Sequence, residues 1–124
     1  MTSINMDFIT NSSSASYTMI GIYVESGLLT NEHLIKIQKA LPDEKITMND
    51  LENYLYDYIE ILIKGTDLDY NLDPDDGLIL GLSYTDMKDE ETLREFKNRI
   101  QQSLKSIFGV DIEPVHLSAC WENR

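Results

Sequence analysis

The sequence predicts a single α+β domain, in which three helices pack on a small mixed or antiparallel sheet of three to four strands. Segments whose apolar residues alternate with a period of two are typical of strands, and they are interspersed with segments of helical period. The chain has 124 residues, of which 42% are hydrophobic, and this is enough for one core. The expected order of elements is β-α-α-(β)-β-α-β, where the bracketed strand is short.

The chain begins with a polar stretch that we expect to precede the domain. Residues 1–16 are rich in Ser and Asn, which is typical of a flexible leader, so the domain is assigned to residues 17–124. From Tyr17 to Val24 the residues on both faces of a period-two pattern are largely apolar. This pattern predicts a central strand that is covered on both sides.

The first predicted helix follows this strand. Thr30 or Asn31 can act as its N-cap, because a short polar side chain there accepts a hydrogen bond from a free backbone N–H group. Pro42 cannot continue a helix, so we expect the helix to end at about Leu41.

The second predicted helix has the clearest periodicity in the sequence. Its apolar positions follow the spacing of one helix face: Leu51, Tyr54, Leu55, Tyr58, Ile59 and Leu62. Thr47 and Asp50 predict an approximate capping box at its start, with Asp in place of the usual Glu. Gly65 is placed to end it in the left-handed conformation.

A hairpin is expected next in the chain. Residues 67–73 and residues 78–84 have the character of two strands, and the second is strongly apolar. Between them, Asp73-Pro74-Asp75-Asp76-Gly77 has the composition of a turn, with Pro presetting the backbone and Asp bonding it locally.

The last third of the chain predicts one helix and one strand. Asp86 or Asp89 is expected to cap the helix, Gly109 to close it, and its apolar positions are Leu93, Phe96, Ile100, Leu104 and Ile107. Residues 110–121 predict the final strand, and Pro114 favours an edge position or a bulge.

The formal net charge of −12 is concentrated in one segment. Residues 43–76 contain eleven Asp and Glu residues and only two lysines, so about a quarter of the chain carries −9. Nucleic-acid binding depends on Lys and Arg that neutralise phosphates, and we therefore expect no direct contact with nucleic acid. Acidity of this density complements a basic protein partner, or it serves only to keep the chain in solution.

The second predicted helix holds the most regularly spaced of these acidic residues. Polar residues at intervals of 3, 4, 3 and 4 lie along one line of a continuous helix, and they are Asp50, Asn53, Asp57, Glu60 and Lys64. Such a row resembles the charge spacing of a nucleic-acid backbone and would complement a basic groove, whereas the alternative is a solvated outer face. The candidate partner-binding residues are Asp50, Asn53, Tyr56, Asp57, Glu60, Asp67, Asp69 and Asp73.

The aspartates of residues 67–77 suggest a calcium loop, because alternating oxygen ligands bind calcium in EF-hand loops. A loop that starts at Asp67 has Leu72 in place of the sharp-turn Gly and Leu78 in place of the bidentate Glu. The register two residues later fails in the same way, so no metal site is predicted. A small-ligand or ion-binding role for this loop or for the Ser-rich residues 10–14 is the alternative function.

His116 and Cys120 are the closest approach to a nucleophile and its base in the sequence. Four residues along a strand span about 13 Å, whereas a nucleophile and its base must lie about 3 Å apart. His33 lies far along the chain, at the start of a predicted helix. The sequence therefore predicts no catalytic residue and no cofactor, and we expect a protein that is not an enzyme.

The cysteine content and the apolar stretches indicate a compartment. A single cysteine, Cys120, excludes an internal disulfide framework and suits a reducing environment. The start of the chain lacks the basic and apolar regions of a secretory signal, and the longest apolar stretch, residues 61–63, is far too short for a membrane span. We expect a cytoplasmic protein that does not contact a membrane.

The start of the chain also resembles that of a group of small proteins. Residues 7–17 read DFITNSSSASY, which is similar to the DFVTNSSSSSF-like start of small proteins from Gram-positive anaerobes and their mobile elements, a family of unknown function. Residues 82–92 and the pair Cys120-Trp121 resemble parts of the same group. The resemblance implies a bacterial or phage setting and an accessory or counter-defence role, and it transfers no functional residue.

Taken together, these observations predict a non-enzymatic protein-interaction module. Its acidic surface would bind a basic protein, such as a nucleic-acid-binding protein, and would imitate nucleic acid as an inhibitor.

Overall fold

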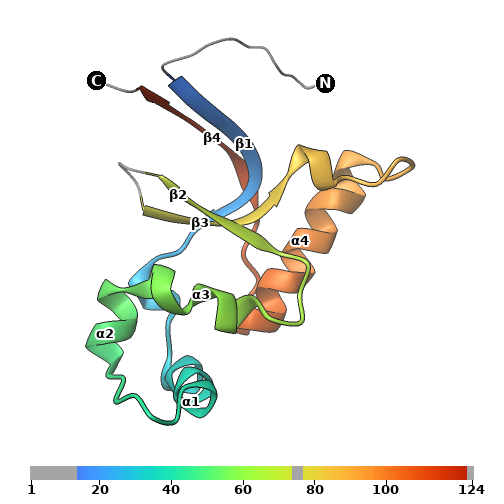
Figure 1. Cartoon of the computed structure of the whole chain (residues 1–124). Coiled ribbons are helices and arrows are strands. Elements are labelled where there is room, and N and C mark those ends of the chain that lie inside the picture. Colours follow the sequence, from blue (N-terminus) through green and yellow to red (C-terminus); the bar gives the residue numbers. More distant parts are fainter. Residues whose placement is uncertain (1–13, 74–76, 123–124) are drawn as a thin grey trace.

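The computed structural model describes residues 14–73 and 77–122, which form one antiparallel sheet and four α-helices (Figure 1). The strands lie in the order β2-β3-β1-β4. Their bounds are Asp69–Asp73 for β2, Gly77–Ser83 for β3, Ser14–Tyr23 for β1 and Val115–Glu122 for β4. The predicted α+β class is confirmed, with an antiparallel sheet and with β4 at an edge behind Pro114.

The helices divide into two groups along the chain. Three short helices lie between β1 and β2, and one long helix lies between β3 and β4. Their bounds are Asn31–Ala40 for α1, Met48–Asn53 for α2, Leu55–Ile63 for α3 and Leu93–Phe108 for α4. Two 3-10 turns, Ser26–Leu28 and Tyr84–Asp86, complete the described elements.

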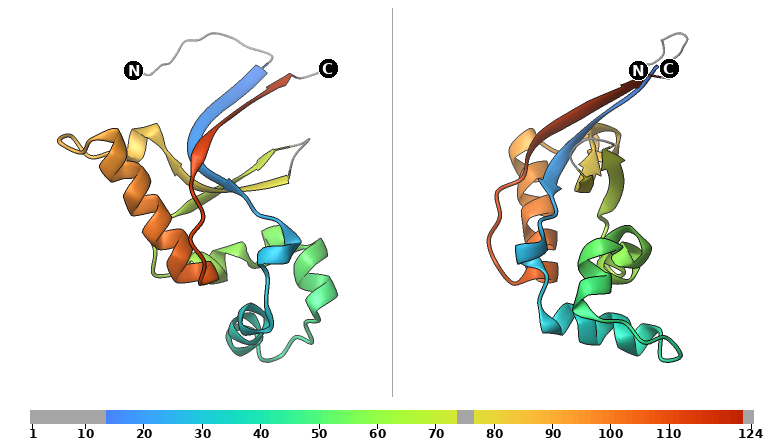
Figure 2. Two further views of the ribbon diagram at one scale, coloured as in Figure 1. Left: turned by 180° about the vertical axis from the view of Figure 1, so that it is seen from behind. Right: turned by 90° about the vertical axis from the view of Figure 1, so that its left-hand side faces the viewer.

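The connections between strands follow the β-α-β-β-α-β order of the split βαβ motif that ferredoxin-like folds share. Strand β1 lies between β3 and β4, although both follow it late in the chain. The two halves of the chain therefore interleave in one sheet. The β1–β4 pair extends away from the helices, and α1 and α2 lie at the opposite end (Figures 1 and 2).

The helices cover one face of the sheet. The strand residues of the main buried cluster all have even numbers, which places them on the same face by strand alternation: Ile20, Ile22, Leu78, Leu80 and Leu82. Ile37 of α1, Ile59 of α3 and Phe96 of α4 are fully buried in the same cluster. Met19 and Ile79 on the other face are also buried, and β1 is an inner strand of the sheet, as predicted.

The two central strands approach each other closely at a pair of glycines. Gly21 of β1 lies opposite Gly81 of β3 in the antiparallel register. A Cβ atom on Gly21 would stand 2.8 Å from the Cα atom of Gly81 and would overlap the backbone of Leu80. The close approach of these paired strands therefore requires the absence of a side chain at both positions.

Several predicted boundaries differ from the structure, and one of them is the start of the final strand, which lies at Val115 rather than at residue 110. Strand β1 begins at Ser14, so the last residues of the predicted polar leader belong to the sheet, while residues 1–13 lie outside the described residues. Helix α4 is capped by Thr92, and the predicted caps Asp86 and Asp89 are wrong. Thr92 and Glu95 have the spacing of a full capping box, which satisfies two free N–H groups at once.

The described helices are all short relative to a lipid bilayer. None of them is long and apolar enough to span a membrane.

Candidate protein-interaction surface

The predicted second helix is broken in the structure. Tyr54 has φ −127° and ψ 38°, which ends α2 at Asn53 and lets α3 begin at Leu55. A continuous helix over residues 47–64 is therefore wrong, and so is the single line of polar residues along it. The Tyr54 side chain at the break has an exposed fraction of 50%, whereas the periodicity predicted that it lies in the core. Leu51 and Leu55 on either side of the break are buried.

Asp50 begins the acidic surface and also holds the start of α2. Its carboxylate Oδ2 accepts the backbone N–H of Thr47 at 3.0 Å, and the Thr47 hydroxyl accepts the N–H of Asp50 at 3.1 Å. The predicted capping box is confirmed. Because the carboxylate of Asp50 is half-buried and fixed by this exchange, its charge acts from a defined position.

The pKa of the half-buried Tyr58 phenol responds to carboxylates of three segments. Its pKa is raised above 10.0, first by burial and then by the negative charges of Asp50, Glu44 and Asp57. These carboxylates come from α2, from the loop after α1 and from α3. The charges that act on this phenol therefore include Glu44, which the helical pattern did not contain.

The outer part of this surface is exposed and carries free charge. Asn53, Tyr56, Asp57 and Glu60 are all exposed, and the Tyr56 side chain has an exposed fraction of 49%. Within the described part of the chain, neither Asp57 nor Glu60 forms an ion pair. Exposed carboxylates that no cation of the chain neutralises are available to a basic partner. We define the acidic face as Glu44, Asp50, Asn53, Tyr56, Asp57 and Glu60.

Asp67 has an internal role in the structure. Its carboxylate forms an ion pair with Arg99 of α4 and accepts a hydrogen bond from the Ser103 hydroxyl at 3.4 Å. Arg99 is held in turn by both carboxylate oxygens of Glu91, at 2.9 Å each, and lies 5.2 Å from the ring centroid of Phe96. Arg99 therefore neutralises much of the negative charge of Asp67, and the ion pair joins the start of the hairpin to α4.

The remaining acidic candidates lie on β2, away from α2 and α3. Asp69 is exposed, and its carboxylate accepts the backbone N–H of Tyr70 at 2.8 Å. Asp73 ends the strand opposite Gly77, and its side chain lies outside the described residues. The structure thus separates the eight predicted residues into the α2–α3 group, the internal Asp67 and the β2 pair.

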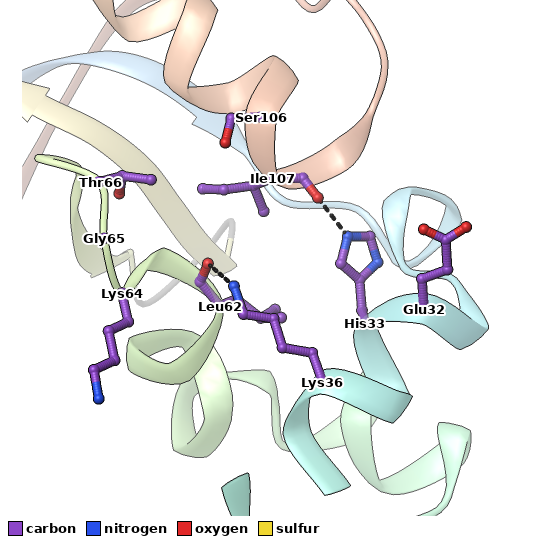
Figure 3. Close-up of a pocket in the computed structure, with 9 residues that line it drawn as sticks. All are labelled: Glu32, His33, Lys36, Leu62, Lys64, Gly65, Thr66, Ser106 and Ile107. Atoms are coloured by element: carbon purple, nitrogen blue, oxygen red, sulfur yellow. Dashed lines mark hydrogen bonds between the residues drawn. The ribbon is translucent and has the colours of Figure 1, made fainter. Parts of the chain in front are cut away.

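A cavity of about 250 Å³ lies between the start of α1 and the ends of α3 and α4 (Figure 3). His33 forms one wall, and its ring connects two helices. Its Nδ1 accepts the backbone N–H of Thr30 at 2.9 Å, so Nε2 carries the proton and donates to the carbonyl of Ile107 at 2.8 Å. Both ring nitrogens are used, and His33 has no free nitrogen with which to act as a base.

Lys36 completes the connection of α1 to its neighbours in this cavity (Figure 3). Its ammonium donates to the carbonyl of Leu62, near the end of α3, at 3.3 Å. A cation at a helix C-terminus is favourable, because the free carbonyls there carry partial negative charge. His33 and Lys36 therefore hold α1 against α4 and α3.

The remaining candidates for chemistry are His116 and Cys120. His116 lies four residues from Cys120 in the same strand, β4, and its ring contacts the Tyr84 hydroxyl, while the Cys120 side chain lies outside the described residues. Among the described residues, no group of three or more His, Cys, Asp or Glu side chains is placed to hold a metal ion. The predicted hairpin of β2 and β3 is present, and its turn residues 74–76 lie outside the description.

Comparisons of the chain with protein-family models, curated proteins and solved structures give no match.

Proposed function

We propose that this chain is a non-enzymatic interaction module whose acidic face binds a basic protein. The observation that carries the proposal is that Asp57 and Glu60, one helical turn apart on α3, are exposed and form no ion pair within the described part of the chain. Like charges brought together repel one another, so a cationic partner that lies across them gains more than it would from scattered charges. Exposed aromatic rings at Tyr54 and Tyr56 add apolar contact area beside the charge.

The partner that best fits this face is a nucleic-acid-binding protein. Its basic groove binds phosphates at close spacing and its aromatic side chains stack on bases, and carboxylates beside the exposed rings of Tyr54 and Tyr56 offer a related pattern. Because the helix breaks at Tyr54, the imitation would be a bent patch rather than a straight row. The resemblance to small proteins of bacteria and their mobile elements favours a cytoplasmic inhibitor or counter-defence protein.

Affinity purification from the native host, read by mass spectrometry, tests this function. The double variant Asp57→Lys/Glu60→Lys is expected to lose a basic partner that the wild-type chain retains. Asp89→Lys/Glu90→Lys is the matched control, since it makes the same change in net charge at exposed residues before α4. Retention of the partner by the first variant, or equal loss in both, would contradict the proposal.

A small-ligand or ion-binding accessory role is the second candidate, and the cavity beside His33 favours it. Thermal melts with calcium, phosphate and nucleotides test it, because a ligand at one hundred times its Kd stabilises a protein by about 2.7 kcal/mol. An unchanged Tm across this set would exclude the tested ligands.

A further inference from the structure

A second charged surface lies on α4, and its sign is opposite to that of the acidic face. A groove of about 410 Å³ runs between α4 and the segment before β4. Arg94, Lys97, Asn98 and Gln101 line it from the helix, and Pro114 lines it from the other side. These four helix positions are spaced i, i+3, i+4 and i+7, so they form one face of α4, distinct from its buried face at Phe96 and Ile100.

The two cations of this groove are available for binding. Within the described part of the chain, neither Arg94 nor Lys97 forms an ion pair, although acidic residues outnumber basic ones by 22 to 10. The adjacent Glu95 is directed elsewhere, since its carboxylate accepts the backbone N–H of Thr92 at 2.8 Å. Glu113 also lines the groove and moderates its positive charge.

The acidic face and the groove carry the same pattern with opposite charges. Helix α3 presents Tyr56-Asp57-x-x-Glu60, and α4 presents Leu93-Arg94-x-x-Lys97. In both patterns an exposed apolar residue precedes a charge, and a second charge of the same sign follows one helical turn later. The exposed fractions are 49% for Tyr56 and 42% for Leu93. Equal spacing lets both acids meet both cations at once, whether two such helices lie parallel or antiparallel.

We propose that the α4 groove binds the acidic face of a second copy of this chain. The contact would join Asp57 and Glu60 of one copy to Arg94 and Lys97 of the next. It is heterologous, because two different surfaces meet, so it builds a ring or a chain of copies unless a two-fold arrangement closes it with both contacts. It needs no other protein, so it can fail independently of the proposed function.

Self-association of the same acidic residues has a consequence for the proposed function. A basic partner and a neighbouring copy would compete for Asp57 and Glu60. Assembly would therefore store the protein with its acidic face covered, and dilution or a tighter-binding partner would release it.

Sedimentation of the purified full chain over a range of concentrations tests the contact. At about 0.1 M salt, where the repulsion between copies that each carry −12 is screened beyond about 10 Å, we expect the average mass of the wild-type protein to rise with concentration, and at about 1 M salt to return to that of the monomer. Arg94→Glu/Lys97→Glu and Asp57→Lys/Glu60→Lys are each expected to stay monomeric alone. Mixed in equal amounts they should associate, because each offers a surface of opposite charge to the other.

Two further variants make the test specific. Arg94→Gln/Lys97→Gln removes the charges with little change in volume, and it should weaken self-association by about tenfold or more. Lys39→Glu/Lys45→Glu makes the same change in net charge as the groove reversal at other exposed lysines, and it should associate like the wild type. A wild type that stays monomeric at about 0.1 M salt, a mixture that stays monomeric, or unchanged association in the Gln variant would overturn the proposal.

Discussion

Gly21 and Gly81 face each other across β1 and β3, and neither position has room for a side chain. A Cβ atom on Gly81 would stand 2.7 Å from the Cα atom of Gly21 and would overlap the carbonyl oxygen of Ile20. The obstacle is backbone in both directions, so no rotation of a side chain can relieve it. The central pair of strands depends on this double absence.

Replacement of either glycine by alanine is therefore expected to destabilise the fold. We expect Gly81→Ala to lower the free energy of unfolding by about 1–3 kcal/mol, as for an overpacked core. Gly27→Ala is the control, because a Cβ atom there would meet nothing within 4 Å. Urea unfolding compares the variants, and equal midpoints for the two would contradict the close approach.

The ion pair of Glu91 and Arg99 makes the free energy of unfolding depend on pH in the acidic range. Hydrogen bonds from the Arg99 side chain, then from the Lys88 backbone, lower the pKa of Glu91 from 4.5 to about 2. Because the folded pKa is below the unfolded pKa, this stabilisation is complete above about pH 4.5. It is lost as the pH falls from there toward 2.

Glu91→Gln isolates this contribution from the other carboxylates. The difference in free energy of unfolding between the wild type and Glu91→Gln should be constant near neutral pH and should shrink between pH 4.5 and 2. Urea unfolding at a series of pH values measures it. A difference that does not change over this range would show that the pair does not titrate with folding.

His33 is expected to contribute to stability through both ring nitrogens. His33→Ala removes the capping contact with Thr30 and leaves the carbonyl of Ile107 without its partner, so we expect a loss of about 1–3 kcal/mol. His33→Gln should lose less, because Gln is a usual residue at this position of a capping box. Thermal melts rank the three proteins, and equal Tm values for both variants would contradict the capping role.

The pKa of Tyr58 reports on the charges of the acidic face. Since its pKa is raised above 10.0, the phenol should stay protonated at a pH where exposed tyrosines ionise. Its contribution to stability is complete below about pH 10 and is lost as the pH rises through the folded pKa. Asp50→Asn and Asp57→Asn should each move the Tyr58 pKa downward, and nuclear magnetic resonance of the labelled ring measures the shift. If neither variant moved the Tyr58 pKa, the carboxylates of Asp50 and Asp57 would not act on this phenol.

The period of the apolar residues and the turn-forming residues between them were sufficient to predict most of the helices and strands. The alternation after Tyr17 predicted the central strand, and the turn composition before Gly77 predicted the hairpin. Gly109, with φ 77°, ends α4 as its position predicted. These features depend on neighbours within one turn or one strand, which is the range over which local sequence acts.

The break at Tyr54 and the internal role of Asp67 were not predictable in this way. Helical spacing of apolar residues continues across Tyr54, so the pattern alone gives no sign of two helices. Asp67 and Arg99 are separated by 32 residues, and only the packing of the hairpin start on α4 brings them together. Glu44 was part of the acidic segment, but its approach to Tyr58 also depends on tertiary structure.

The position of β1 between β3 and β4 has a consequence for folding during synthesis of the chain. Its partners are made late, and the pairing of Gly21 with Val115 spans most of the described chain. Contacts between such distant residues cost loop-closure entropy before they give stability, so folding is slow. During synthesis on the ribosome, one edge of β1 stays unpaired until β4 has been made. An unpaired strand edge can form hydrogen bonds with the strand of another chain, so this edge is a site of misfolding in the nascent chain.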